Sequence, residues 1–372
     1  RSLRKFGPRA LTCSSEVAQW RFELMPELGP DPGFVADLGP LFEQVAEVVR
    51  RADALLITSG AGMSADSGLA SFRGRSAGLR TGTWAPLKAM RMDYSSMCRP
   101  SWFKKDPRLA WAYWASMHQC YTACAPHAGF QILAKWGSCL KFGFFSVTSN
   151  IDGHWVRTPG VGPEKVWEIH GVVTHMQCVE FDGRVWPVDN AQIGELKVPL
   201  WDLAAGEGVE VLDHRAEWLP AEVGEDGVIL SLAGSRLKTL GVRRPGGADL
   251  CRVAEGQRLP ACPETGKLAR PNVLMFEDRA ACMHRIDEQG RRFETWLGTL
   301  PADAQLVVVE VGAGRTVPTI REHSERVVGE FLHATLVRIN WDDAEVPQHL
   351  SSRSIAVGGV GALDALSRID AL

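Results

Sequence analysis

The sequence predicts an α/β fold: a Rossmann-like parallel sheet with helices on both faces, plus a small insertion domain that contains an SH3-like β module. Three observations favour this fold. Short apolar, β-branched runs alternate with segments of helical periodicity. These runs end in glycine or polar residues, as the strands of a parallel sheet do at the edge where loops begin. One long segment, residues 177–267, lacks this alternation and is rich in Gly, Asp and Glu.

The composition agrees with a globular chain of one large and one smaller domain. The chain has 372 residues, of which 45% are hydrophobic and 23% charged. A net charge of −3 gives no electrostatic case for a nucleic-acid or membrane-surface partner. No apolar run approaches the roughly 20 residues that span a bilayer. We therefore expect neither a membrane nor a nucleic acid as a partner.

The cysteines predict an intracellular location, cytoplasmic or nuclear. Their number, nine, is odd and their spacing irregular, which suits reduced thiols better than a disulfide framework. The chain begins with Arg1, and its first 15 residues are basic and free of acidic side chains. Organellar targeting therefore stays open beside a disordered or fragmentary start.

The elements follow in order along the chain. Residues 1–40 carry Pro and Gly clusters and are predicted to be an N-terminal extension. A helix from Leu41 leads into the apolar strand 54–58, and the Rossmann-like NAD-binding domain is predicted to cover residues 41–176 and 268–372. Its other expected elements are a helix at 126–136, strands at 142–148, 166–171, 304–314 and 335–340, and a last strand and helix within 351–369.

Residues 177–267 are predicted to form the small domain. Within them, residues 207–255 alternate short β-prone runs with turn signals such as GEDG. We interpret this stretch as an inserted β module, SH3-like or Tudor-like; an elaborated loop is the alternative. A module of this kind would suit a protein partner.

The stretch GAGMSADSGLASFRG, residues 60–74, follows the first strand. Such a glycine-rich turn lets backbone amides approach a pyrophosphate, and its hydroxyls and the guanidinium of Arg73 suit ribose and phosphate contacts. GAG alone is equally compatible with a structural turn. Its spacing also differs from the G-x-G-x-x-G fingerprint of ordinary dehydrogenases.

Polar side chains end two further strands. Asn150 and Asp152 lie in TSNIDG, where a parallel sheet places ligand-facing residues. Taken alone, this sequence is more typical of a turn. His170 ends the run VWEIHG, and a lone histidine is usually structural. Because His170 shares the predicted sheet edge with Asn150, Asp152 and Arg73, we interpret it as a general base.

GAGMSADSGLASFRG, TSNIDG and EIHG resemble, in order and approximate separation, the motifs of the sirtuins, the NAD-dependent protein deacylases. RPNVLMFED, VEVGAG and RIN resemble later sirtuin segments, and the likeness covers residues 41–178 and 262–370. It implies NAD+ as co-substrate and an acyl-lysine protein as substrate. The acyl group would pass to ADP-ribose as nicotinamide leaves. An ADP-ribosyltransferase or NAD hydrolase, and a non-catalytic NAD-binding scaffold, are the alternatives.

The resemblance also implies roles for single residues. His170 would be the catalytic base, and Asn150 and Asp152 would orient the nicotinamide ribose. The implied NAD-binding residues are Gly60, Ala61, Gly62, Ser64, Ser67, Phe72, Arg73, Ser149, Gly312, Ala313, Gly314 and Asn340. The chain departs from the family pattern at Leu69-Ala70-Ser71, where sirtuins have Ile-Pro-Asp, at Ser149 for Gln, at Glu277 for Gly and at Gly314 for Ser.

The structural zinc of sirtuins is held by two cysteine pairs, of which this chain keeps half. Cys178 and Cys262 are present, and Thr265 stands where the partner of Cys262 is expected. His175 and Asp182 are neighbouring candidates for further ligands. We interpret the two cysteines as buried, unpartnered remnants of a zinc site and predict no high-affinity zinc.

Overall fold

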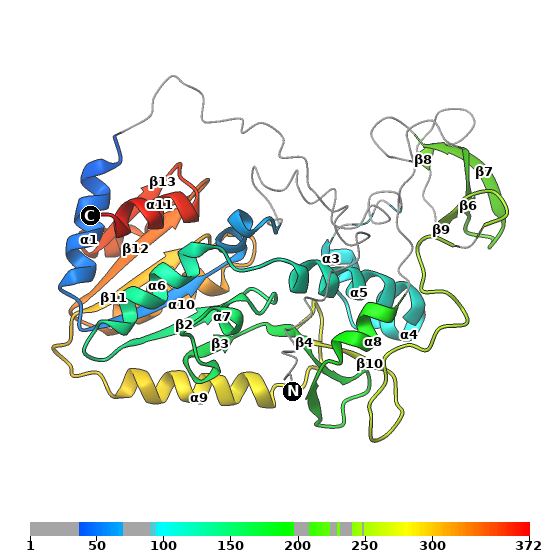
Figure 1. The fold of residues 1–372 in the computed structure, drawn as a ribbon, viewed down its shortest axis with the longest axis horizontal. Helices are drawn as coiled ribbons and strands as arrows, with labels where there is room; N and C mark the ends of the chain where they lie inside the picture. The colour runs from blue at the N-terminus through cyan, green and yellow to red at the C-terminus, as the bar shows by residue number, and fades with distance from the viewer. Residues whose placement is uncertain are drawn as a thin grey trace, which may run out of the picture. The chain divides into compact units, whose positions relative to one another are not determined.

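The computed structural model describes residues 37–69, 90, 92, 94–196, 208–223, 229–230, 240–247 and 249–372 (Figure 1). The chain divides into two units, Arg1–Asp37 and Leu38–Leu372. Every helix and strand reported below belongs to the second unit. The predicted N-terminal extension lies almost entirely outside the described residues.

Six parallel strands form the main sheet, which confirms the predicted Rossmann-like architecture. Their order is β13-β12-β11-β1-β2-β3, and all five neighbouring pairs run parallel. The strands are β1 (Ala54–Ser59), β2 (Phe144–Thr148), β3 (Val166–Glu168), β11 (Leu306–Val311), β12 (Ala334–Asn340) and β13 (Ser354–Gly358). Every residue of β1, β2 and β11 is buried, which is why apolar residues predominate in these strands.

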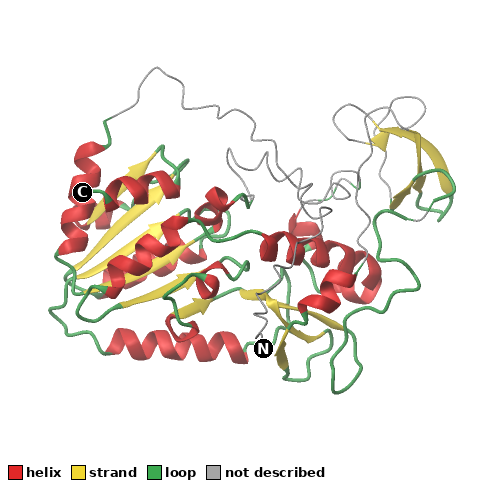
Figure 2. Cartoon of the chain, viewed as in Figure 1, coloured by secondary structure: helices red, strands yellow, loops and turns green. Residues whose placement is uncertain are grey.

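Helices cover both faces of this sheet (Figure 2). On one face, α1 (Gly39–Arg50), α6 (Ala128–Ser138) and α11 (Ala362–Asp370) pack on Leu55 and Ile57 of β1. On the other face, α9 (His284–Gly298) and α10 (Thr319–Glu330) pack on Ala54 and Leu56. Successive side chains of a strand point to opposite faces, so β1 contributes to both cores.

The connections place a switch point between β1 and β11. The chain reaches β2 from β1 through α6 on one face, and it reaches β12 from β11 through α10 on the other, in the opposite direction along the sheet. Ligands of open α/β sheets bind outside the carboxyl ends of the strands at such a point. The loops after β1 and β11 are therefore where a ligand is expected.

A second core lies around an antiparallel sheet of order β10-β4-β5. Its strands are β4 (Gly171–Cys178), β5 (Val185–Pro187) and β10 (Ala269–Val273). They pack with a helical group: α3 (Tyr94–Met97), α4 (Ser101–Lys105), α5 (Pro107–Ala123) and α8 (Asn190–Glu195). Residues of α5 thus share a core with β4 and β10, and the predicted domain boundaries remain a prediction.

Strands also occur inside the predicted insertion. They form an antiparallel sheet of order β8-β7-β6-β9. Its members are β6 (Gly208–Leu212), β7 (Trp218–Val223), β8 (Ile229–Leu230) and β9 (Gly241–Arg243). Closure into an SH3-like barrel stays a prediction, since residues 224–228 and 231–239 lie outside the described part. The other described elements are short. They are the 3-10 helices η2 (Ala61–Ser67), η4 (Pro163–Lys165) and η5 (Gln348–Arg353) and the α-helix α7 (His154–Arg157).

No described helix is long and apolar enough to cross a bilayer.

Candidate active site at the carboxyl edge of the sheet

The glycine loops after β1 and β11 are joined by their backbones. The Gly60 amide donates to the Val311 carbonyl at 3.0 Å, and the Gly62 amide donates to the Gly312 carbonyl at 2.9 Å. The Gly312 amide in turn donates to the Ile339 carbonyl of β12 at 2.9 Å. Three neighbouring strands are thereby tied together at the edge where the switch point lies.

This joint requires glycine. A Cβ on Gly60 would lie 2.7 Å from both the Ala313 Cα and the Gly312 carbonyl oxygen. Gly312 has a φ of +63°, and its Cβ would lie 2.3 Å from the Met63 nitrogen. Main-chain atoms cannot swing aside as a side chain can, so these glycines let the two loops touch.

Ser64, Asn150 and Asp152 form one hydrogen-bonded group. The Ser64 hydroxyl donates to Asp152 Oδ2 at 2.7 Å, and Asn150 Nδ2 donates to Ser64 Oγ at 3.1 Å and to the Gly60 carbonyl at 3.0 Å. The His154 amide donates to Asp152 Oδ1 at 2.9 Å. Ser64 and Asp152 are buried, while Asn150 is half-buried. The structure thus joins predicted residues from two separate motifs.

Behind this group lies a hydroxyl network that the sequence interpretation missed. The Ser59 hydroxyl donates to Thr148 Oγ1 at 2.9 Å and accepts from the Trp155 indole N–H at 2.9 Å. Thr148 Oγ1 also accepts from the Asn150 amide at 3.1 Å. The only local signal is a hydroxyl at the last position of each apolar strand. The network fixes the start of the loop that carries Asn150.

His127 holds the loop after β1 against α6. One ring nitrogen, Nε2, contacts the Met63 carbonyl at 2.7 Å, and Nδ1 accepts from the Gly129 amide at 3.0 Å. Burial lowers the pKa of His127, which favours the neutral ring. Its own amide donates to Ser67 Oγ at 3.1 Å. Ser67, predicted to bind NAD, therefore has a structural contact within the protein.

His170 lies between β3 and β4, beside the loop that carries Asn150. It is half-buried, and burial lowers its pKa below 6.5, opposed by a hydrogen bond to the Ser149 carbonyl. Because a carbonyl only accepts, the bonded ring nitrogen carries the proton. The other nitrogen of the neutral ring is then a proton acceptor, as a general base requires.

The backbone around His170 is fixed on both sides. Its carbonyl accepts from the Leu274 amide at 2.9 Å. The next residue, Gly171, has a φ of +76°, and a Cβ there would lie 2.1 Å from the Asn272 carbonyl oxygen. His170 is therefore held at the junction of the main sheet and the β10-β4-β5 sheet.

The loop after β11 brings Ala313 and Asn340 together. Asn340 Nδ2 donates to the Ala313 carbonyl at 2.8 Å, and its Oδ1 accepts from the amides of Asp342 and Asp343 at 3.2 and 3.3 Å. Ala313 is buried, whereas Gly314 is exposed and a Cβ on it would meet no atom within 4 Å. Within this part of the site, Gly314 faces open space.

Two predicted NAD-binding residues, Phe72 and Arg73, lie outside the described residues. So do Ala70 and Ser71, which belong to the tripeptide that differs from the sirtuin pattern. Leu69, its first member, is buried. Ala61 and Gly62 are half-buried at the start of η2, in contact with the Gly312 loop.

A buried ion pair supports the loop that follows β10. Arg270 and Asp278 have fully buried side chains with Nη1 and Oδ2 2.8 Å apart. Between them, Leu274 and Phe276 are 37% and 39% exposed. An apolar surface therefore lies on the segment whose Leu274 amide bonds His170.

Glu277, the acidic residue that replaces a family glycine, keeps a glycine-like backbone. Its φ is +59°, and its carboxylate accepts from Arg99 Nη1 at 2.9 Å. The negative charge that Glu277 adds is thus paired with Arg99.

The two cysteines expected as zinc remnants are buried, as predicted, but they have polar partners. Ligand atoms of Cys178, Asp182 and Cys262 lie within 4.8 Å of one another, with Cys178 Sγ 2.8 Å from Asp182 Oδ2. Burial, followed by the Asp182 hydrogen bond, raises the pKa of Cys178 to about 12. His175 does not belong to this group. The residues fit three of the four positions of a tetrahedral zinc site.

We expect zinc to bind weakly at this three-donor group. Among the described residues, no fourth His, Cys, Asp or Glu side chain joins this group. The Cys178 thiol must also lose its proton to bind metal, and its raised pKa opposes that loss. Metal analysis after dialysis against EDTA should find less than one zinc per chain, with the melting temperature unchanged. Stoichiometric zinc that resists EDTA, or a fall in melting temperature on its removal, would contradict this.

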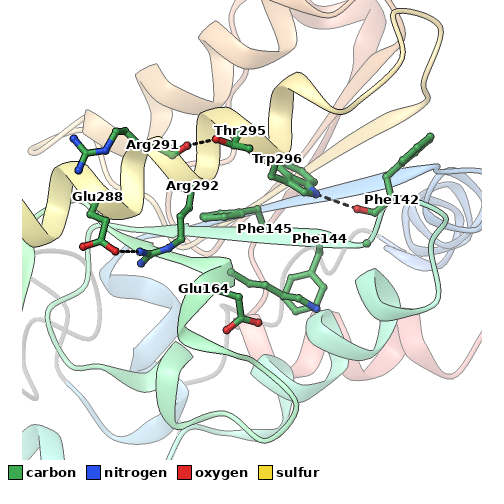
Figure 3. Close-up of a pocket in the computed structure, with 11 residues that line it drawn as sticks. Phe142, Phe144, Phe145, Glu164, Glu288, Arg291, Arg292, Thr295 and Trp296 are labelled. Carbon is green, nitrogen blue, oxygen red and sulfur yellow. Dashed lines mark hydrogen bonds and ion pairs between the residues drawn. The ribbon is translucent and has the colours of Figure 1, made fainter.

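A separate cavity lies at the other end of the sheet. It has a volume of about 540 Å³ and is lined by Phe144 and Phe145 of β2 and by α9 (Figure 3). Two interactions lie in its wall: Arg292 pairs with Glu288 at 2.8 Å, and the Trp296 indole N–H donates to the Phe142 carbonyl at 3.0 Å. It lies at the amino end of β2, so it is separate from the site built around Asn150.

Comparison with known proteins finds a matching family model. Residues 60–196 match the model described as the Sir2 family. That range begins at the first glycine loop and ends after α8, and it includes Ser64, Asn150, Asp152 and His170.

Curated relatives are similar over parts of the chain. NAD-dependent protein deacylase 2 of Pseudomonas aeruginosa is 35% identical over 137 residues, which cover 36% of this chain and 50% of that protein. A Deinococcus radiodurans NAD-dependent protein deacylase is 30% identical over 42% of this chain and 59% of its own length. A Candida albicans protein of the same name is 26% identical over 77% and 83%. The chain thus spans about half the length of the bacterial relatives.

Solved structures show the same fold. A Sir2 homologue crystallised with NAD superposes with a TM-score of 0.52 at 18% identity, covering 88% of this chain and 92% of that one. A structure described as the structural basis of sirtuin substrate affinity has a TM-score of 0.53 at 16% identity, covering 88% and 97%. At such identities the likeness concerns the fold alone.

Proposed function

We propose that the chain is a member of the Sir2 family and an NAD-dependent protein lysine deacylase, which transfers the acyl group to ADP-ribose and releases nicotinamide. One observation supports this most directly. The Ser64–Asn150–Asp152 group and a neutral His170 occupy the same edge of the sheet, at its switch point. The names of the relatives agree with it.

NAD+ enters this proposal as co-substrate, and the residues present fit it. The glycine loops carry no side chain that would keep a pyrophosphate away from the main chain, and Gly314 leaves open space beside them. Ser64, Asn150 and Asp152 are a polar group suited to ribose hydroxyls, and their mutual bonds fix them before a ligand arrives. Phe72 and Arg73 keep the NAD-binding roles that the resemblance implies.

His170 would supply the base. In the proposed reaction the acyl oxygen of the substrate attacks C1′ of the nicotinamide ribose as nicotinamide leaves. The unprotonated nitrogen of His170 then accepts the proton of a ribose hydroxyl, which lets that oxygen attack the acyl carbon. The Ser149 carbonyl fixes which nitrogen is free, since it accepts from the other. The apolar surface of Leu274 and Phe276 would lie along the acyl-lysine substrate.

The pH dependence tests the role of His170. Its pKa is lowered, so the neutral base persists below pH 6.5 and is lost only as the pH falls through the lowered value. We therefore expect the acidic limb of kcat/KM, which reports the free enzyme, to have its midpoint below 6.5. The melting temperature should be measured at each pH, so that unfolding is not taken for titration. A midpoint above 6.5 would contradict the assignment.

The reaction products decide between the candidate functions. The chain is incubated with NAD+ and an acetyl-lysine peptide, and the products are identified by mass spectrometry. Acetylated ADP-ribose supports deacylation. Free ADP-ribose alone would indicate an NAD hydrolase, and ADP-ribosylated protein a transferase. Equally low nicotinamide release from the wild type and His170→Ala would indicate an NAD-binding scaffold.

The proposal extends to partner, location and domains. The substrate would be an acyl-lysine protein, and the β6–β9 module would bind a further protein. The cysteines in the described part are free thiols, which supports an intracellular location, cytoplasmic or nuclear. Residues 41–176 and 268–372 would bind NAD, and residues 177–267 would form the small domain.

A further inference from the structure

The last turn of α5 carries two cysteines that the proposed reaction does not use. Cys120 and Cys124 are both partly exposed, and their thiols are hydrogen-bonded to each other. The Cys124 amide donates to the Cys120 carbonyl at 3.3 Å, so the two lie one turn apart. Four residues of helix separate Cα atoms by about 6 Å. Disulfides span about 4.4–6.8 Å between Cα atoms, so this pair is within reach of one.

The positively charged side chain of Arg157 lies at this end of α5. Arg157 donates to the carbonyls of Tyr121, Thr122 and Cys124 at 2.8, 3.1 and 2.9 Å. The Cys120 hydrogen bond, helped by the charge of Arg157, lowers the pKa of Cys124 to about 7 against the opposing effects of burial and Asp152. The thiolate is the reactive form of cysteine. Cys124, which lies beside Arg157 and has left the helix, is therefore assigned as the nucleophile of the pair.

We propose that Cys120 and Cys124 form a reversible dithiol modification site, oxidised by a hydroperoxide. The Cys124 thiolate attacks the peroxide, whose O–O bond breaks to give Cys124 sulfenic acid and an alcohol or water. The Cys120 sulfur then attacks the Cys124 sulfur, forming the S–S bond and releasing water. In sum, two thiols lose two electrons and two protons, and the hydroperoxide takes them up.

Arg157 connects this pair to the proposed NAD site. Its Nη2 also contacts the Asp152 carbonyl at 3.4 Å. Cβ atoms four residues apart on a helix are about 5–6 Å apart. A disulfide needs about 3.5–4.5 Å, so the backbone must yield. Cys124 has left the helix, with φ −80° and ψ 130°, and is the residue free to move. The Cys124 carbonyl would then shift relative to Arg157. Because Arg157 also contacts the Asp152 carbonyl, Asp152 would shift as well.

Peptide mapping of the full chain tests the modification. The chain is treated with stoichiometric hydrogen peroxide, remaining thiols are alkylated, and the protein is digested with trypsin. No Lys or Arg occurs between Arg108 and Lys135, so both cysteines fall in one peptide. We expect this peptide to lose two hydrogen atoms and to carry no alkyl group. Prior reduction with dithiothreitol should restore two alkyl groups.

Variants and a control cysteine identify the order of events. Cys120→Ser should stop at a sulfenic acid on Cys124 that dimedone traps, whereas Cys124→Ser should leave Cys120 alkylated. Cys139, which is exposed, should be alkylated under all conditions. Full alkylation of both cysteines after peroxide, or linkage of either to another cysteine, would overturn the proposal.

A second readout tests the link through Arg157, and this part rests on the proposed function. The KM for NAD+ should rise several-fold in the oxidised wild type and return to its starting value after reduction. Cys139→Ser should behave as the wild type does. An unchanged KM in a protein whose disulfide is proven by mass would overturn the link, while the modification site would stand.

Discussion

Replacing His170 with alanine is expected to lower kcat/KM for deacylation by about 10²–10⁴-fold, the usual contribution of a positioned base. The variant removes the free ring nitrogen that accepts the ribose proton. His170 is half-buried, and its carbonyl, which accepts from the Leu274 amide, is kept in the variant, so the fold should remain. Formation of acetylated ADP-ribose is measured under first-order conditions, with the melting temperature recorded alongside.

Nicotinamide exchange distinguishes a lost base from a lost site. In the proposed reaction nicotinamide leaves before the base acts, so His170→Ala should still exchange labelled nicotinamide into NAD+ when the acyl-peptide is present. His175→Ala is the matched control, because His175 is a partly buried histidine of β4 whose pKa burial also lowers. It should retain wild-type turnover. Loss of both exchange and turnover in His170→Ala would mean that His170 positions the ligand instead.

The sequence predicted the sheet well because its strands are buried on both faces. Residues 54–59 and 306–311 are mostly apolar for that reason. The meeting of Asn150, Asp152 and His170 at one edge was also predictable. It follows from parallel strands, whose carboxyl ends all reach the same edge.

Two kinds of feature could not be predicted. Helix α5 was not anticipated, because the run from Leu109 to Ala115 is buried all round and shows no amphipathic period. Contacts between distant segments were missed as well, since no local pattern encodes them. His127 bonds the Met63 carbonyl across 64 residues and so fixes the loop at the site. Asp182, by contrast, was named from the sequence as a candidate ligand beside Cys178, and its Oδ2 lies 2.8 Å from the Cys178 sulfur.

Gly312→Ala is expected to give the largest loss of stability among the substitutions considered. Alanine at a φ of +63° adds strain of about 1–3 kcal/mol. Its Cβ, 2.3 Å from the Met63 nitrogen, must also push two backbone loops apart, which costs about 1–3 kcal/mol more. Urea unfolding measures the change. Calorimetric titration should show that NAD+ affinity falls too, because the loops that separate are those proposed to bind it.

Gly314→Ala tests the ligand contact without disturbing the contact between the two loops. Gly314 is two residues further along the same loop, yet its Cβ would meet nothing within 4 Å, so the free energy of unfolding should change by no more than about 0.5 kcal/mol. If NAD+ affinity falls in Gly314→Ala at unchanged stability, the added methyl group occupies space that the ligand needs. Wild-type stability in Gly312→Ala would instead mean that the two loops do not meet as described. The pair therefore tests the loop contact and the ligand position independently, with one methyl group in each case.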